Sequence, residues 1–212
     1  MIFILRKLYN IYLKLVPQFE DYFLKELGGC NSVLDLGCGS KSPLRFLKRR
    51  IYSIGVDAFA PAIKKSKKAG IHSKYVKADI AKIKINSKSV DCVIAIDVLE
   101  HLSKEDGLEL ISKMGGAARK RVVIFTPNGF LHQHEFDKNK WQIHKSGWSV
   151  DELRKMGYSV KGVNGLKWLR TERANIRFRP KILWMAVSDF SQYLTYFFPK
   201  LAFQLLCVKR LQ

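Results

Sequence analysis

The sequence predicts a doubly wound α/β fold, in which helices cover both faces of a mostly parallel sheet. Short, almost wholly apolar segments alternate with charged segments whose apolar residues recur at helical spacing. Strands that are apolar throughout have no polar face to show to water, which is typical of parallel strands buried on both sides. At 212 residues and 47% hydrophobic, the chain is long enough for one such domain.

The individual elements follow from the same two patterns. Residues 6–27 are expected to form an amphipathic helix, interrupted at Pro17 and ended by Gly28 and Gly29. The expected strands, which are short and apolar, span residues 32–36, 53–56, 73–77, 90–96, 121–125, 159–163 and 203–209. The other expected helices, which carry the charged residues, span residues 43–49, 61–69, 104–118 and 151–156.

Charge is the outlying property of the composition. The 38 Lys and Arg against 18 Asp and Glu give a formal net charge of +20. A surface this cationic favours an anionic partner, such as lipid headgroups, a phosphorylated small molecule or nucleic acid, although solubility alone is an equal explanation. No segment reaches the roughly 20 uninterrupted apolar residues that a membrane-spanning helix needs.

The four cysteines lie far apart in apolar surroundings, which indicates reduced thiols and a cytoplasmic protein. They are Cys30, Cys38, Cys92 and Cys207.

Polar residues and glycines gather where the predicted strands end. The first strand runs into Gly37 and Gly39, and the second ends at Asp57. Asp79 follows the third strand, and Asp97 ends the fourth, shortly before Glu100 and His101. Ligands of open α/β sheets bind outside these carboxyl ends, so a ligand site is expected here.

Four segments carry a family resemblance, in the same order along the chain. They are VLDLGCG at 33–39, GVD at 55–57, ADI at 78–80 and DCVIAIDVLEHL at 91–102. Together they resemble the four motifs of class I S-adenosylmethionine-dependent methyltransferases, most closely the broad type-11 group with its small-molecule, quinone and lipid methyltransferases. The resemblance implies a Rossmann-like sheet of seven strands in the order 3-2-1-4-5-7-6, with strand 7 antiparallel.

The same resemblance implies S-adenosylmethionine as cofactor and S-adenosylhomocysteine as product. By this pattern Asp57 binds the ribose diol, Asp79 faces the adenine amino group, and Asp97 meets the ammonium or sulfonium. The full set of implied cofactor contacts, ordered along the chain, is Asp35, Gly37, Cys38, Gly39, Asp57, Ala58, Asp79, Ile80, Asp97 and Val98.

Two features complicate the first motif. Lys41 stands where a third glycine is common in the family. The spacing of Gly37, Gly39 and Ser42 also approaches the dinucleotide fingerprint of dehydrogenases. Nicotinamide binding has no evident use for Asp79 or for the cluster from Asp97 onward, so the methyltransferase interpretation is preferred.

The methyl acceptor is expected to bind near the fourth and fifth strands. His101 is the candidate catalytic base, although a histidine bonded to backbone at a helix start is an equal explanation. A long connection at 126–148 supplies the other acceptor candidates, which are Asn128, His132, His134, His144 and Trp148. Its segment HKSGW at 144–148 resembles one found in uncharacterised bacterial and archaeal methyltransferases.

Metal binding by this connection is not expected. Its polar side chains with ligand chemistry are His132, His134, Glu135, Asp137 and His144, and their spacing fits no closed zinc pattern.

We expect one domain over residues 1–212, with a helical cap at 1–29 and acceptor-side insertions at 126–148 and 168–199. The second insertion begins with Arg170, Arg173, Arg177, Arg179 and Lys181 and continues as an apolar stretch. This pattern is typical of an interfacial anchor or lipid-facing lid, while core packing or a dimer surface explains the apolar part equally well.

The expected function is therefore methyl transfer to a small molecule, a saccharide precursor or a lipid-linked molecule. Peripheral contact with an anionic membrane stays open, and so does the oligomeric state. A cofactor-binding scaffold without turnover is the alternative from another class. An RNA acceptor is least favoured, because the sequence contains no recognisable RNA-binding module.

Overall fold

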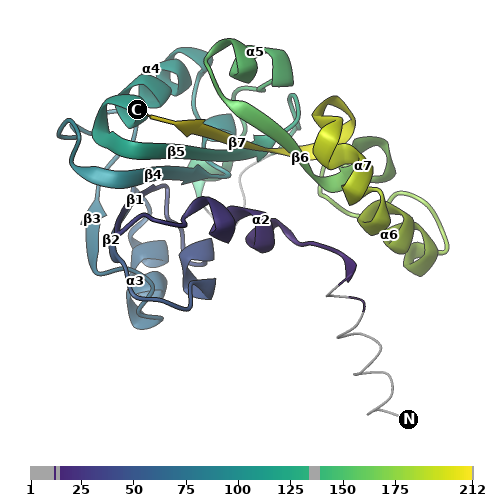
Figure 1. Cartoon of the computed structure of the whole chain (residues 1–212), viewed down its shortest axis with the longest axis horizontal. Coiled ribbons are helices and arrows are strands. Elements are labelled where there is room, and N and C mark those ends of the chain that lie inside the picture. Colours follow the sequence, from purple (N-terminus) through teal and green to yellow (C-terminus); the bar gives the residue numbers. More distant parts are fainter. Residues whose placement is uncertain (1–11, 13–14, 134–138, 212) are drawn as a thin grey trace.

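The computed structural model describes Tyr12, residues 15–133 and residues 139–211, and its centre is one seven-stranded sheet (Figure 1). The strand order is β3-β2-β1-β4-β5-β7-β6. In chain order the strands are β1 (Ser32–Leu36), β2 (Tyr52–Asp57), β3 (Lys74–Lys77), β4 (Val90–Ile96), β5 (Ala118–Pro127), β6 (Ser159–Leu166) and β7 (Ala202–Arg210). Pairs from β3 to β5 are parallel, whereas β7 runs antiparallel to β5 and β6. The predicted strand order and antiparallel last strand are confirmed.

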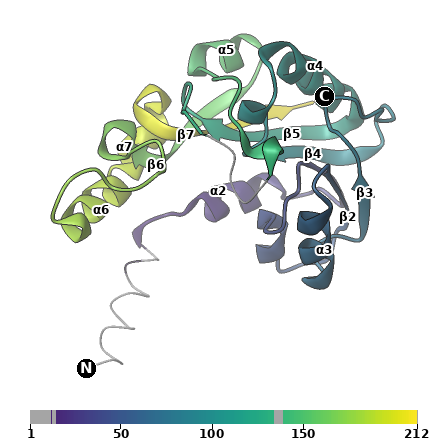
Figure 2. The same cartoon turned by 180° about the vertical axis from the view of Figure 1, so that it is seen from behind.

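Helices cover both faces of this sheet. They are α2 (Phe19–Glu26), α3 (Ala60–Lys68), α4 (Lys104–Ala117), α5 (Val150–Lys155), α6 (Lys181–Phe190) and α7 (Gln192–Phe197). Helices α4 and α5 lie on one face and α2 and α3 on the other, while α6 and α7 project beyond the β6 edge (Figures 1 and 2).

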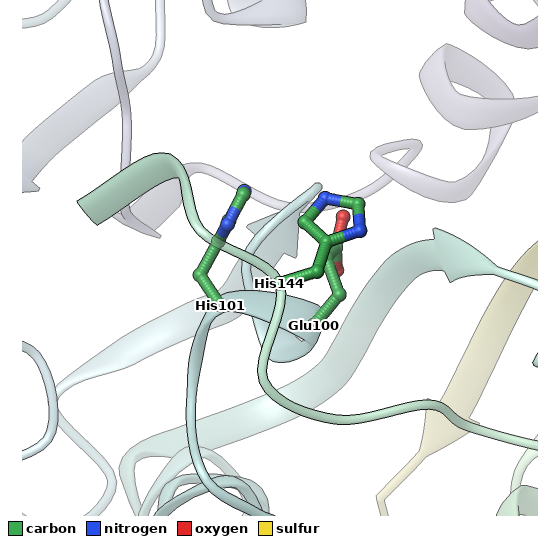
Figure 3. Close-up of side chains that lie close together, drawn as sticks. All are labelled: Glu100, His101 and His144. Carbon is green, nitrogen blue, oxygen red and sulfur yellow. The ribbon is translucent and has the colours of Figure 1, made fainter. Parts of the chain in front are cut away.

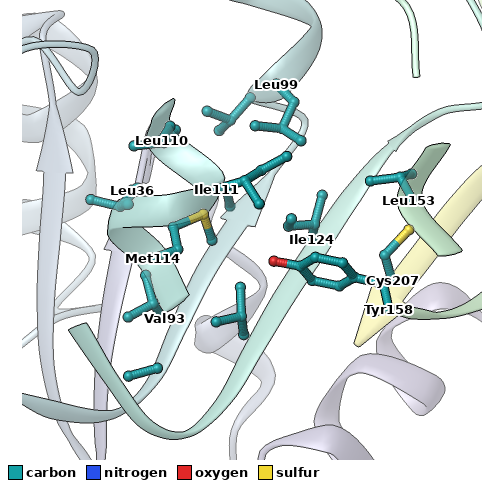
Figure 4. Packing of buried hydrophobic residues seen from close by; sticks show 14 of the residues in the cluster. Leu36, Val93, Leu99, Leu110, Ile111, Met114, Ile124, Leu153, Tyr158 and Cys207 are labelled. Carbon is teal, nitrogen blue, oxygen red and sulfur yellow. The ribbon is translucent and has the colours of Figure 1, made fainter. Parts of the chain in front are cut away.

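The central strands send alternate side chains into two cores. On β4, Val93 packs beneath α4 and α5, whereas Ile94 packs beneath α2. The larger core joins Leu110 and Met114 of α4 to Ile124 of β5 (Figure 4). Because both faces are apolar, polar groups can collect only at the ends of these strands.

Most predicted elements lie within a residue or two of the observed ones, and the main difference concerns residues 43–49. There the chain forms only a 3-10 turn, Pro43–Phe46, in which Leu44 alone is buried. One buried side chain gives too little packing to stabilise further helical turns. Of the helix expected over residues 6–27, residues 6–11 and 13–14 lie outside the described residues, and α2 begins shortly after Pro17.

The α6–α7 pair has the reverse of the usual amphipathic arrangement. Its buried side chains are polar, namely Ser188, Gln192 and Thr195. Gln192 donates from Nε2 to the Gly162 carbonyl at 2.9 Å and accepts from the Gly165 amide at 3.3 Å. The helices therefore meet β6 through polar groups and turn their apolar side chains outward.

Close approach to β6 depends on glycine. A Cβ added at Gly162 would lie 2.2 Å from the Thr195 carbonyl oxygen, and one added at Gly165 would lie 2.1 Å from that of Ser188. Gly165 also has a φ of +68°, which disfavours other residues. These two glycines set the distance between the strand and the helix pair.

Within the described residues, none of the helices has the length and apolar character needed to cross a membrane. Cys30, Cys38, Cys92 and Cys207 are all buried free thiols.

We expect Gly162→Ala to destabilise the fold by about 1–3 kcal/mol, because the new methyl group overpacks the contact with α7. This loss should lower the melting temperature in a calorimetric scan by several degrees. Gly115→Ala on α4 is the matched control, because a Cβ there meets nothing within 4 Å. Equal melting temperatures for the two variants would contradict the close packing of α7 on β6.

Candidate active site

A cavity of about 260 Å³ opens at the carboxyl ends of β1, β2 and β4. The predicted cofactor residues that line it are Gly37, Gly39, Asp57, Ala58, Asp79, Ile80, Asp97 and Val98. His101 lines it as well, and Asn139, Trp141 and Gln142 contribute from the connection after β5. These residues belong to separate motifs in the sequence, and the fold brings them together around one cavity.

The turn after β1 is shaped by two glycines in left-handed conformation. Gly37 has a φ of +70° and Gly39 a φ of +56°. A Cβ on Gly37 would lie 2.5 Å from Val98 Cγ2, so the turn after β1 closely approaches the turn after β4. Glycine is needed at Gly37 both for its conformation and for this contact.

Asp57 joins the first two strand-end turns. Its Oδ2 accepts the Gly39 amide at 2.8 Å and its Oδ1 accepts the Phe59 amide at 2.7 Å. Burial raises the pKa of Asp57, and the two amide bonds oppose that shift. Each carboxylate oxygen keeps a second lone pair for a hydroxyl donor.

Asp35 and Cys38 lie behind the cavity wall and are not among the described residues that line it. Asp35 Oδ2 accepts from Ser42 Oγ at 2.6 Å and pairs with His72 Nε2 at 2.8 Å, all three side chains being buried. The Cys38 amide donates to the Val56 carbonyl at 2.9 Å, and burial raises the pKa of its thiol. Both residues therefore support the glycine turn from beneath.

Asp79 and Asp97 are positioned by local hydrogen bonds. Asp79 Oδ1 accepts the Ala81 amide at 3.0 Å. Asp97 has a φ of +52°, and its amide donates to the Phe125 carbonyl at 2.9 Å. Gln204 of β7, which the sequence did not single out, donates from Nε2 to Asp97 Oδ1 at 3.1 Å. The walls of the cavity desolvate Asp97 and raise its pKa to about 7, although its side chain still reaches the solvent.

The side chains of Glu100, His101 and His144 lie close together (Figure 3), and that of His101 lines the cavity. The two imidazole rings lie 4.8 Å apart between centroids. His101 Nδ1 is 3.3 Å from the Ile143 carbonyl oxygen, and Thr126 Oγ1 donates to Glu100 Oε2 at 3.0 Å. No role for Glu100 was predicted, because nothing in its motif shows that its side chain faces a residue from the β5 connection.

Burial disfavours the charged form of each side chain in this group. It raises the pKa of Glu100, aided by nearby Asp97. It lowers the pKa of His101 to about 4, with His144 adding to the effect, and lowers the pKa of His144 as well. The neutral imidazole is therefore favoured at both histidines, and with a pKa of about 4 His101 is a weak base.

Two of the acceptor candidates, Trp148 and Asn128, make contacts within the protein. Trp148 is fully buried, donates from Nε1 to Ser146 Oγ at 3.1 Å and lies under Lys104 Nζ, 3.7 Å from the ring centroid. Asn128 donates from Nδ2 to the Pro199, Lys200 and Ala202 carbonyls. Trp148 is enclosed in the core and cannot contact an acceptor. The amide nitrogen of Asn128 already donates to backbone carbonyls.

The remaining candidates differ in position. His144 is half-buried beside His101, and its Nδ1 lies 2.8 Å from the Leu131 carbonyl oxygen. His132 is exposed. His134 lies outside the described residues, as do Glu135 and Asp137.

Comparison with known proteins gives a consistent result. Residues 34–124 match a family model described as a methyltransferase domain. A S-adenosylmethionine-dependent methyltransferase from Archaeoglobus fulgidus superposes with a TM-score of 0.56 at 20% identity, covering 96% of this chain and 99% of that one. One from Mesorhizobium loti gives 0.57 at 16% identity, covering 91% and 97%.

A third solved structure, magnesium protoporphyrin IX methyltransferase from Synechocystis with bound S-adenosylmethionine, gives a TM-score of 0.50 at 17% identity, covering 89% of this chain and 75% of that one. Among curated proteins, no sequence matches the chain. At these identities the solved structures show the shared fold.

We expect His72→Ala to lower the free energy of unfolding by at least about 1–3 kcal/mol, because the buried Asp35 carboxylate loses a hydrogen-bond partner. Urea unfolding followed by circular dichroism measures this change. The exposed Lys64→Ala on α3 is the control and should unfold like the wild type. If both variants unfold at the same urea concentration, the Asp35–His72 pair does not support the turn.

Proposed function

We propose that this chain is a class I S-adenosylmethionine-dependent methyltransferase, which binds its cofactor along the strand-end cavity and methylates an acceptor held at a membrane surface. S-adenosylmethionine is the methyl donor of this enzyme class, and S-adenosylhomocysteine is the product. The observation that carries the cofactor assignment is the meeting of Asp57, Asp79 and Asp97 around one cavity.

The polar groups of the cavity fit a nucleoside that carries a positive charge. Asp57 would accept the ribose hydroxyls through its free lone pairs, and Asp79 with the Ile80 backbone would hold the adenine. Asp97 would face the positive ammonium and sulfonium, whose charge favours its ionised form despite the raised pKa. When bound, the cofactor supplies an electrophilic methyl group.

His101 would contact the acceptor at the far end of the cavity, with Gln142 beside it. Because the pKa of His101 is lowered to about 4, its imidazole is a poor proton acceptor. Holding the acceptor close and aligned would then supply much of the rate enhancement. A scaffold that binds the cofactor without turnover stays as the alternative.

Isothermal titration of S-adenosylmethionine into the protein tests the cofactor assignment. We expect a dissociation constant in the micromolar range, about 8 kcal/mol. Asp57→Ala should weaken binding by roughly 10- to 100-fold, because charge-assisted hydrogen bonds are lost. Glu105→Ala, an exposed carboxylate on α4, should bind like the wild type. Unchanged affinity in Asp57→Ala would remove Asp57 from the site.

The outer face of α6 and α7 supports the membrane part of the proposal. It exposes Ile182 at 81%, Phe197 at 68% and Phe198 at 58%. Other exposed apolar residues of this face are Leu183, Met185, Val187 and Leu194, whereas Phe190 contacts Tyr12 and Tyr193 donates to the Leu15 carbonyl. A face this apolar on a helix pair whose buried side is polar favours contact with a lipid surface.

Cations flank this apolar face. Arg173, Arg177, Arg179 and Lys181 are all exposed. Each can contribute about 1 kcal/mol of attraction to an anionic leaflet. Arg170 belongs to the interior instead, since it donates from Nε to the Asn164 carbonyl at 2.9 Å and lies 3.7 Å from Asp189.

The proposed membrane face is connected to the cavity. The bonds from Asn128 reach residues 199–202, directly after α7, and the next strand carries Gln204, which contacts Asp97. A membrane-bound helix pair would therefore hold the cavity near the bilayer. For this reason we propose a lipid-linked acceptor in preference to a soluble one or RNA.

Flotation with vesicles of about one-third anionic phospholipid tests this docking. We expect the wild type to float at moderate salt and an Ile182→Glu/Phe197→Glu variant to stay in the pellet, because buried charges oppose insertion. Leu108→Glu is the matched control, an exposed apolar residue of α4 at 44%. A wild type that stays in the pellet, or forms dimers through this face, would overturn the membrane assignment.

A further inference from the structure

We propose that Glu100, His101 and His144 bind a divalent transition-metal ion, which activates a hydroxyl of the acceptor. The binding of the ion is inferred from the side chains alone, whereas its part in methyl transfer rests on the proposed function. The acceptor atom would accordingly be an oxygen.

The three side chains converge from two segments. Glu100 and His101 belong to the short 3-10 helix after β4, and His144 to the connection after β5. One potential ligand atom from each lies within 4.8 Å of those from the other two. Metal–ligand bonds of about 2.0–2.2 Å need ligand atoms roughly 3 Å apart, so small side-chain rotations would close the site.

The hydrogen bonds leave the histidines in the tautomer that a metal requires. The nearest partner of each Nδ1 is a backbone carbonyl, from Ile143 for His101 and from Leu131 for His144. A carbonyl only accepts, so each Nδ1 must carry the proton, and each Nε2 presents a lone pair. Backbone carbonyls commonly orient metal-binding histidines in this way.

The carboxylate is oriented in a similar manner. Glu100 is 2% exposed, and its Oε2 accepts from Thr126 Oγ1. Its backbone carbonyl also accepts the amides of Lys145 and Ser146, at 2.7 and 3.1 Å. Through these two bonds the segment that carries His144 is fastened to the residue that supplies the carboxylate.

If Glu100 is ionised, neither neutral imidazole beside it supplies a positive charge to balance the buried carboxylate. A divalent cation would supply that charge and ionise Glu100, while neutral imidazoles are already in the state that binds metals. The raised pKa of Glu100 and the lowered pKa of both histidines agree with this arrangement.

The donor set limits the choice of ion. Two imidazoles and one carboxylate suit manganese, iron(II) or zinc better than calcium or magnesium, which prefer oxygen ligands. Because His101 also lines the cavity, the open coordination positions would face the bound acceptor.

With the ion in place, methyl transfer to a hydroxyl would need no base from the protein. The ion would lower the pKa of a coordinated acceptor hydroxyl, whose proton would leave to water. The oxygen electron pair would then form the new bond to the methyl carbon. The bond between that carbon and sulfur would break, with its electrons remaining on sulfur as a neutral thioether.

Manganese titration of the chelator-treated full chain tests the proposal, with free Mn²⁺ followed by its electron paramagnetic resonance signal. We expect one ion bound per chain, and binding at least tenfold weaker in His144→Ala. Glu105→Ala should bind manganese like the wild type.

S-adenosylhomocysteine binding, measured by calorimetry on the same samples, reports folding and the cofactor site, because His144 is not among the described residues lining the cavity. His144→Ala should keep that affinity. Wild-type protein that binds S-adenosylhomocysteine but no Mn²⁺, or His144→Ala that binds Mn²⁺ as well as wild type, would overturn the metal site and leave the proposed function standing. Loss of S-adenosylhomocysteine binding in the wild type would instead overturn the proposed function.

Discussion

The structure depends on the burial of its parallel strands on both faces. Strands such as β4 carry apolar side chains into a core on either side, so their polar neighbours have room only beyond the strand ends. That constraint brings Asp57, Asp79 and Asp97 to one edge of the sheet. The hydrogen bonds from Gly39 and Phe59 to Asp57 then convert neighbouring turns into one rigid wall.

A second set of contacts links this wall to the opposite edge. Gln204 of β7 reaches Asp97, and Asn128 ties the start of the β5 connection to the residues after α7. The helix pair α6–α7 is in turn held on β6 by its polar side and by two glycines. The strand-end cavity and the outward apolar face therefore belong to one connected body.

The fold and the cofactor motifs could be predicted because local patterns determine them. Buried strands such as β1 and β4 are marked by continuous apolar residues, and Asp57 and Asp97 are marked by following such strands. Side-chain direction could not be predicted in the same way. Asp35 turns to His72 and Trp148 enters the core because of partners distant in sequence. The grouping of Glu100 with His144 likewise depends on how the β5 connection folds back, which spacing does not show.

The position of β7 has a consequence for how the chain reaches this structure during synthesis. Strands β5 and β6 adjoin only through β7, although β7 follows both of them in the sequence. Until residues 202–210 have emerged, the edge of β5 keeps unpaired amides and carbonyls that could pair with another chain. Completion of the sheet is therefore a late, long-range step, and a nascent chain at that stage is the form most exposed to aggregation and most in need of a chaperone.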